Sequence, residues 1–286
     1  MLNFRFFHII VLASSLLLLN ACKKEGSNIN NSANPLAQKK YNEVCFLTTH
    51  NAFNAKENYY LLPNQDYGIT RQLADGVRGL MIDAYEGTSQ ALVYHGVSIG
   101  GNQFLTEVLD EIKTFLDNNT QEVVSIVFEN YCPLEQLINA IDDAGLDQYL
   151  YTHNGTWQTL QQMIDNNQRL VIYVEYGYDS ESQPAWMMNA YDIMFDTHFE
   201  YEKLSDFNCN IFRGRSGSKE LFLVNHWLSN GGLPNKSKAH VANQYDIVKK
   251  RIDSCSVEQN HFVNFLAVDF YNIGEAKRVV DEVNGL

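Results

Sequence analysis

The segment Val123-Val124-Ser125-Ile126-Val127-Phe128 is a nearly unbroken run of β-branched and aromatic residues. A strand with one solvent-exposed face alternates apolar and polar residues, whereas a strand buried on both faces is apolar throughout. The run therefore predicts a strand in the interior of a parallel sheet. Parallel neighbours need long crossovers, so the chain must also supply helices between its strands.

Strand-like and helix-like segments do alternate along the chain. Strands are expected at 44–47, 77–82, 91–94, 123–128, 170–174, 191–195, 221–224 and 262–268, and helices at 70–75, 103–118, 133–145, 157–166, 238–254 and 275–283. Eight strands in this order predict an α/β fold, a distorted (β/α)8 TIM barrel with right-handed crossovers. The distortion is expected because 176–189 and 196–219 look irregular. A doubly wound open sheet is the alternative, weakened because no glycine-rich loop follows the first strand.

The N-terminal segment has the pattern of an export signal. Residues 1–21 combine Arg5, an apolar stretch over 6–19 and the small residue Ala21, which predicts a signal peptide. Cys22 follows directly, as in the lipobox of bacterial lipoproteins, and is predicted to carry the lipid. The alternative is an ordinary signal peptide that merely precedes a cysteine. Residues 22–39 then predict lipid attachment and a flexible tether. The protein is expected to be exported and lipid-anchored to a bacterial membrane, at the outer membrane or cell surface, with a single domain over 40–286.

The formal net charge of −13 argues against nucleic acid as a partner. It permits a small anionic substrate if a local cation reverses the sign inside a pocket. No segment indicates a protein partner. The cysteines show no zinc spacing, and an exported protein permits disulfides. Cys209 and Cys255 flank the last third of the domain and are the predicted pair, whereas Cys45 lies inside a predicted buried strand and is predicted to be a core residue.

Polar side chains follow almost every expected strand. In a parallel barrel these positions meet at one end, where the chemistry of such barrels lies. They are His50, Asn51, Asp83, His95, Glu129, Asn130, Glu175, Asn225, His226 and Asp269. Two histidines with an acid between them suit general acid–base catalysis on a phosphate ester, because imidazole titrates near neutrality. Hydrogen-bonded structural histidines, and a helix-capping Glu129, are the competing interpretations.

Six segments, in this order and spacing, resemble the phosphatidylinositol-specific phospholipase C X-domain superfamily. They are LTTHNAF (47–53), GVRGLMID (76–83), VYHG (93–96), EVVSIVFEN (122–130), NQRLVI (167–172) and FLAVDFY (265–271). The resemblance is to the single-domain type of bacteria and plants. It implies a distorted TIM barrel and a phosphoric diester hydrolase that cleaves a phosphatidylinositol-like phospholipid or inositol phosphate. In that reaction the inositol 2-hydroxyl attacks the neighbouring phosphodiester, giving a cyclic phosphate and diacylglycerol.

The resemblance also implies roles for the strand-end residues. His50 corresponds to the general base and His95 to the general acid, and Asp269 would orient His50. Asn51, Asp83 and Glu129 match ligands of the calcium-dependent branch, which implies Ca²⁺ bound by hard oxygen donors. Met81 stands where that branch has a further carboxylate, so a weak site is expected.

Glu175, His226 and Tyr271 are the predicted substrate contacts. Glu175 takes a position where phosphoinositide-binding relatives have Lys or Arg, which favours an unphosphorylated headgroup. His226 and Trp227 either contact the substrate ring or pack. Strand alternation puts Arg78 on the face opposite Asp83, in a structural role. Two other functions stay open: another phosphodiesterase of the glycerophosphodiester or sphingomyelin type, and a catalytically degenerate surface-binding lipoprotein.

Overall fold

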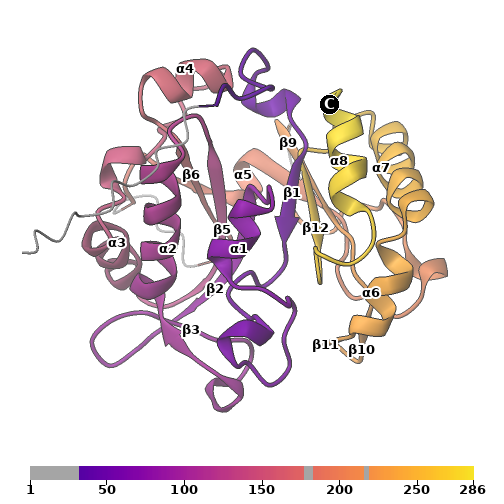
Figure 1. Cartoon of the computed structure of the whole chain (residues 1–286), viewed down its shortest axis with the longest axis horizontal. Coiled ribbons are helices and arrows are strands. Elements are labelled where there is room, and N and C mark those ends of the chain that lie inside the picture. Colours follow the sequence, from indigo (N-terminus) through magenta and orange to yellow (C-terminus); the bar gives the residue numbers. More distant parts are fainter. Residues whose placement is uncertain (1–31, 177–182, 216–218) are drawn as a thin grey trace, which may run out of the picture.

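A computed structural model describes residues 32–176, 183–215 and 219–286 (Figure 1). The predicted signal peptide and Cys22 lie outside the described residues. The parallel strands are β1 (Phe46–Thr49), β2 (Gly79–Tyr85), β5 (Val124–Tyr131), β6 (Leu170–Val174), β7 (Met187–Asn189), β8 (Met194–Asp196), β9 (Leu221–Asn225) and β12 (Phe265–Val268). The helices are α1 (Ile69–Ala74), α2 (Leu105–Asn118), α3 (Leu134–Asp143), α4 (Leu160–Asp165), α5 (Ala190–Ile193), α6 (Lys236–Ala242), α7 (Tyr245–Gln259) and α8 (Ala276–Asn284).

These eight strands form one curled sheet in the order β7-β6-β5-β2-β1-β12-β9-β8. β1 pairs in parallel with both β2 and β12, so the order follows the chain around a barrel. Within the described ranges no ladder joins β7 to β8, and the short helix α5 connects them instead. Figure 1 shows the helices around the outside of the sheet, from α2 and α3 on one side to α7 and α8 on the other. The predicted distorted (β/α)8 barrel is confirmed.

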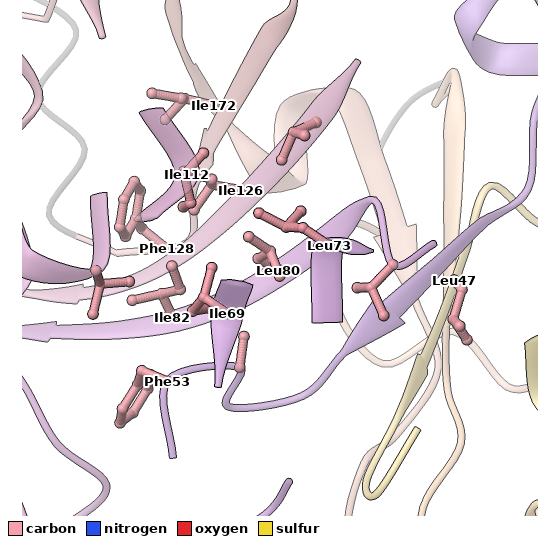
Figure 2. Close-up of a cluster of buried hydrophobic side chains, with 14 of the residues drawn as sticks. Leu47, Phe53, Ile69, Leu73, Leu80, Ile82, Ile112, Ile126, Phe128 and Ile172 are labelled. Atoms are coloured by element: carbon pink, nitrogen blue, oxygen red, sulfur yellow. The ribbon is translucent and has the colours of Figure 1, made fainter. Parts of the chain in front are cut away.

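The side chains on the two faces of each barrel strand belong to two different hydrophobic clusters. On the outer face, Leu80, Ile82, Ile126 and Phe128 pack with side chains of α1 and α2 such as Leu73 (Figure 2). The inner face supplies a second cluster that includes Met81, Val127, Tyr173, Leu223 and Phe265. Side chains alternate between faces with a period of two. Polar residues two positions beyond the inner cluster therefore come to the mouth of the barrel.

Several predicted elements need correction. Segment 91–94 forms β3 (Leu92–Val93), which pairs antiparallel with β2 rather than as a barrel strand. Only six residues separate it from β2, too few for a parallel crossover. The eighth barrel strand is instead β7, inside a stretch expected to be irregular. Segment 191–195 is divided between α5 and β8, and segment 238–254 is divided between α6 and α7.

The remaining short elements lie in connecting segments. Strand β4 (Gln103–Phe104) pairs with β3, and β10 (Ser229–Asn230) pairs with β11 (Leu233–Pro234). Single 3-10 turns occupy Tyr41–Glu43, Lys56–Asn58, Ser98–Gly100, Asp147–Tyr149 and Leu204–Asp206. No helix in the described part of the chain is long and apolar enough to cross a membrane.

The cysteine predictions are confirmed. Cys209 and Cys255 form a disulfide that ties the segment between β8 and β9 to α7. Cys45 is a buried free cysteine directly before β1. Arg78 also takes its predicted structural place, because its Nε donates to Glu122 Oε2 at 2.8 Å on the outer side of the sheet.

Candidate active site

A cavity of about 230 Å³ opens at the C-terminal ends of the barrel strands. It is lined by His50, Asn51, Met81, Asp83, His95, Val127, Glu129, Glu175, Phe199, Glu200, Arg213, Trp227, Ser229 and Gly232. Most of the predicted site residues therefore meet in one place. They run from His50 to Glu175 in the chain, and the barrel topology brings them together.

One half of the site is a histidine held by an acid. His50 follows β1, and its Nδ1 lies 2.8 Å from Oδ1 of Asp269, which follows the neighbouring strand β12. Asn64 donates to the same carboxylate oxygen at 3.0 Å. Trp227 stacks on the His50 ring with centroids 3.8 Å apart and planes 7° from parallel. The carboxylate accepts a hydrogen bond from Nδ1–H and the indole fixes the ring plane, which leaves Nε2 as the atom that can accept a proton.

The other half of the site is a second histidine–carboxylate pair. His95 follows β3, and its Nδ1 lies 3.2 Å from Asp83 Oδ2 and 3.0 Å from Asn51 Nδ2. The hydrogen bond to Asp83 raises the pKa of His95 above its usual value, although partial burial opposes the shift. Asn51 adopts a left-handed backbone conformation, with φ of 47°, at the sharp turn after β1. The Asp83 carboxylate beside Nδ1 therefore favours the protonated form of His95.

The two histidines face each other across the cavity. Their ring centroids are 6.4 Å apart and the rings are nearly perpendicular, at 83°. A group placed between them can lose a proton to one ring and gain one from the other. The pairing of one acceptor and one donor on opposite sides of a small cavity is the arrangement that general acid–base catalysis requires.

Oxygen donors lie beside this pair. Strand register places Glu129 of β5 next to Asp83 of β2, and Tyr131 donates its hydroxyl to Glu129 Oε1. The Asn51 amide nitrogen donates to Asn64 Oδ1 at 3.3 Å, so the amide oxygen is the atom open to a cation. The described residues contain no cluster of three or more His, Cys, Asp or Glu arranged for a metal. A hard cation here would need the Asn51 amide as its third protein donor, because the Met81 thioether is a soft ligand.

Arg213 is a cavity residue that the sequence did not indicate. Its Nη1 donates to Glu175 Oε2 at 2.7 Å, and its Nε donates to Asp196 Oδ2 at 2.9 Å. Burial raises the pKa of Glu175 to about 7, although the Arg213 charge opposes that rise. Arg213 lies in the segment expected to be irregular, where no strand end marks a position. Glu175 is the sequence feature that could have pointed to Arg213, because a buried carboxylate needs a cation beside it.

Two predicted substrate contacts do not reach the cavity. His226 is fully buried, and its Nε2 lies 2.9 Å from the carbonyl oxygen of Ala242. Leu223 faces the barrel interior, so alternation turns His226 outward and returns Trp227 to the cavity. Tyr271 is also buried, and its hydroxyl donates to Asp75 Oδ2 at 2.9 Å. In this structure His226 and Tyr271 therefore pack in the interior instead of contacting the cavity, whereas Glu175 does line it.

The fold and the opposed histidine–carboxylate pairs define an α/β-barrel protein with a candidate acid–base site at its mouth. The family model described as PI-PLC X 1 matches residues 36–284, and the chain belongs to this family. A PI-PLC X domain-containing protein of Arabidopsis thaliana is 27% identical over 86% of this chain and 62% of its own length. PI-PLC X domain-containing protein 1 of Arthroderma benhamiae is 24% identical over 87% of each chain.

Solved structures confirm the fold. A variant of the phosphatidylinositol-specific phospholipase C from Staphylococcus aureus aligns with a TM-score of 0.59 at 16% identity, covering 89% of this chain and 94% of that chain. A second variant of that enzyme aligns with a TM-score of 0.57 at 15% identity, covering 86% and 94%. Family and fold together support a phospholipase C-like phosphodiesterase at the level of the family.

Proposed function

We propose that the protein is a phosphoric diester hydrolase that releases the headgroup of a phosphatidylinositol-like phospholipid through a cyclic phosphate. The opposed His50 and His95 rings are the observation that carries this proposal. His50 Nε2 takes the proton of the headgroup hydroxyl, and the oxygen attacks the neighbouring phosphorus. The bond from phosphorus to the glycerol oxygen breaks, and His95 gives that oxygen its proton. The products are a cyclic phosphodiester and an alcohol, and the two histidines have exchanged protonation states.

Asp269 and Trp227 act on the base rather than on the substrate. The carboxylate keeps the proton on His50 Nδ1 and stabilises the imidazolium after proton transfer, as the acid of a catalytic triad does. The stacked indole prevents rotation of the ring about its side-chain bonds. The base is therefore oriented before the substrate arrives, and this orientation lowers the entropy cost of the reaction.

The cavity needs a positive charge that its own residues do not supply in full. Among the described residues, four carboxylates line it, from Asp83, Glu129, Glu175 and Glu200, and the guanidinium of Arg213 is paired with Glu175 and Asp196. A phosphodiester anion entering this cavity would meet net repulsion. We propose Ca²⁺ held by Asn51, Asp83 and Glu129, weakly because Met81 adds no hard ligand. When bound, the ion would neutralise charge on the phosphate oxygens.

The Glu175–Arg213 pair bears on the headgroup. Arg213 has its charge already matched by carboxylates, so it offers little to a further phosphate on the ring. Carboxylate and guanidinium together offer acceptors and donors that suit hydroxyl groups. We therefore favour an unphosphorylated polyol headgroup such as inositol.

A product assay tests the proposal. Purified protein is offered phosphatidylinositol, its phosphorylated forms, sphingomyelin and glycerophosphodiesters, with Ca²⁺ and with EGTA, and the released headgroup is identified. We expect cyclic inositol phosphate from unphosphorylated phosphatidylinositol and loss of release in chelator that added Ca²⁺ restores. Release of choline phosphate or glycerol phosphate would assign a different phosphodiesterase. Headgroup binding without any product would assign a binding protein.

We also propose that the protein is exported and held on a bacterial membrane through a lipid on Cys22. The small residue before Cys22 supports this, together with an asparagine- and serine-rich tether after it. Expressed as the full chain, it should partition with membranes and incorporate labelled fatty acid. Cys22→Ala should abolish labelling. Labelling that persists in this variant would rule out the anchor.

A further inference from the structure

A second pocket, of about 310 Å³, lies between α7 and the segment that connects β8 to β9. The wall from α7 consists of side chains that recur at spacings of three and four residues and so share one face of the helix. They are Ile247, Lys250, Arg251, Ser254 and Glu258. The connecting segment supplies the other wall, from Leu204 to Cys209. None of the described residues lines both this pocket and the catalytic cavity, so the pocket is a separate site.

Covalent and hydrogen bonds hold the two walls together. Cys209 on the segment and Cys255 on α7 form the disulfide. Gln259 Nε2 at the end of α7 donates to the carbonyl oxygen of Cys209 at 2.8 Å. Arg251 Nη1 donates to the carbonyl oxygen of Asn208 at 2.5 Å. The two walls are therefore tied at several points, and the pocket between them is a built feature of the fold.

Arg251 places a buried guanidinium in this pocket, with only 5% of the residue exposed. Its Nη2 donates to the Tyr201 hydroxyl at 3.2 Å, and its central carbon lies 5.3 Å and 4.8 Å from the ring centroids of Tyr201 and Phe207. All of these partners are neutral. Among the described residues, no acceptor meets the Nε–H and no carboxylate forms an ion pair with the group. Burial lowers the pKa of Arg251, as expected for a charge held without a counter-ion.

Two other guanidiniums of the interior show how such a charge is usually matched. Arg213 pairs with two carboxylates. Arg169 has neutral partners, but its Nε donates to Asn167 Oδ1 at 3.0 Å and its Nη1 donates to two backbone carbonyls. Of these three side chains in the described part of the chain, Arg251 is the one whose Nε lacks a partner. Buried charges are normally paired, so Arg251 has the capacity to hold an anion that the chain does not supply.

The other polar residues of the pocket favour an anion too. Lys250 is exposed beside Arg251 and forms no ion pair within the described ranges, and Ser254 lies one turn further along the same face. Glu258 is the one acid among the described lining residues, so the two cations outnumber it. Guanidinium, ammonium and hydroxyl groups all donate hydrogen bonds to carboxylate or phosphate oxygens. The pocket is therefore locally positive in a chain of net charge −13.

We infer that this pocket binds a small organic anion, with its oxygens against Arg251 and Lys250 and a short apolar body against Leu204 and Phe207. The volume is at the lower end of the range for small-molecule sites and fits a ligand of this size. Carboxylates and phosphate monoesters share the required chemistry, because both present oxygens to a guanidinium. The inference is independent of phosphodiester cleavage, since the pocket is separate from the catalytic cavity.

Calorimetric titration with phenyl phosphate and with benzoate tests the inference, in EGTA so that Ca²⁺ does not attract the anions to the catalytic cavity. Phenol, which has the same ring without the anionic group, is the ligand control. The variants are Arg251→Met and Lys250→Met. Lys249→Met is the matched protein control, because Lys249 precedes Lys250 on α7 but pairs with Asp253 and does not line the pocket. Thermal unfolding checks the fold of each variant, since Arg251 also joins the two walls.

We expect one-to-one binding of at least one of the two anions and no binding of phenol. Lys250→Met should weaken the affinity about fivefold, the effect of one partly exposed ion pair. Arg251→Met should abolish binding, and Lys249→Met should match the wild type. The anion that binds more tightly then identifies the ligand as a phosphate ester or a carboxylic acid.

Failure of both anions to bind the wild-type protein would overturn the inference. Affinity that is unchanged in Lys250→Met and in folded Arg251→Met would also overturn it, because the anion would then lie elsewhere on the protein. If Arg251→Met does not fold, unchanged affinity in Lys250→Met is sufficient to overturn it. Equal affinity for phenol and the two anions would do so as well, because binding would then owe nothing to the charge of Arg251.

Discussion

The Nδ1–H group of His50 donates a hydrogen bond to Asp269 Oδ1 at 2.8 Å, between the ends of two paired parallel strands. The contact joins residues 219 positions apart and exists only because β1 and β12 are neighbours in the barrel. It determines which imidazole nitrogen is available to the substrate. The chemistry of the site therefore depends directly on closure of the sheet between the first and last strands.

Asp269→Asn tests this relationship. The new amide can donate to Nδ1, which moves the ring proton to Nε2 and removes the base. We expect kcat to fall by about 10²–10⁴-fold, the usual contribution of a positioned base, with little change in KM. Steady-state kinetics on the headgroup-release assay would measure it. Asp253→Asn, at an exposed aspartate paired with Lys249 on α7, is the matched control and should keep full activity.

Arg213→Met tests the buried ion pairs beside the cavity. Removing the guanidinium leaves the Glu175 and Asp196 carboxylates buried without their cation, which should cost about 3–5 kcal/mol in the free energy of unfolding. Arg278 also pairs with two carboxylates but at the surface, so Arg278→Met should leave the unfolding midpoint near that of the wild type. Chemical denaturation compares the two. Equal destabilisation would show that burial of the Arg213 network is unimportant.

The disulfide supports the segment that carries Arg213. Cys209 lies four residues before Arg213, and its partner Cys255 lies on α7 at a sequence separation of 46. Replacing both by serine should cost about 4 kcal/mol through greater freedom of the unfolded chain, and it should also lower kcat/KM. Cys132→Ser, at a buried free cysteine, controls for loss of a thiol alone. Wild-type activity and stability in the double variant would contradict this role.

His226 should make stability depend on pH. Burial lowers the pKa of His226 to about 4 from an ordinary value near 6.5. As the pH falls below 6.5 the unfolded chain takes up a proton that the folded protein excludes, so stability is lost between 6.5 and 4 by up to about 3 kcal/mol. His226→Gln, which cannot titrate, should lose less stability over this range. Urea unfolding at pH 7 and pH 4 measures it, and an unchanged difference between the two pH values would refute the role.

The sequence predicted those parts of the fold and the site that depend on local patterns along the chain. The unbroken run before Glu129 predicted a buried parallel strand, and the strand ends predicted His50, Asp83, His95 and Asp269 at one mouth. β7 was missed because three residues with a buried pattern give no periodicity to detect. Arg213 was missed because its place depends on tertiary contacts and a disulfide. The choice between His226 and Trp227 as the cavity residue was within reach, since strand alternation from Leu223 places Trp227 on the inner face.

The central claim is that His50 and His95 act as a base and acid pair, and turnover in His50→Ala and His95→Ala tests it most directly. Each variant is assayed for release of water-soluble inositol phosphate from phosphatidylinositol with Ca²⁺ present, and its fold is checked by thermal unfolding. His240→Ala, at an exposed histidine on α6, is the control. The account predicts a loss of at least about 10²-fold in each site variant and none in the control. Wild-type turnover in both correctly folded site variants would contradict it.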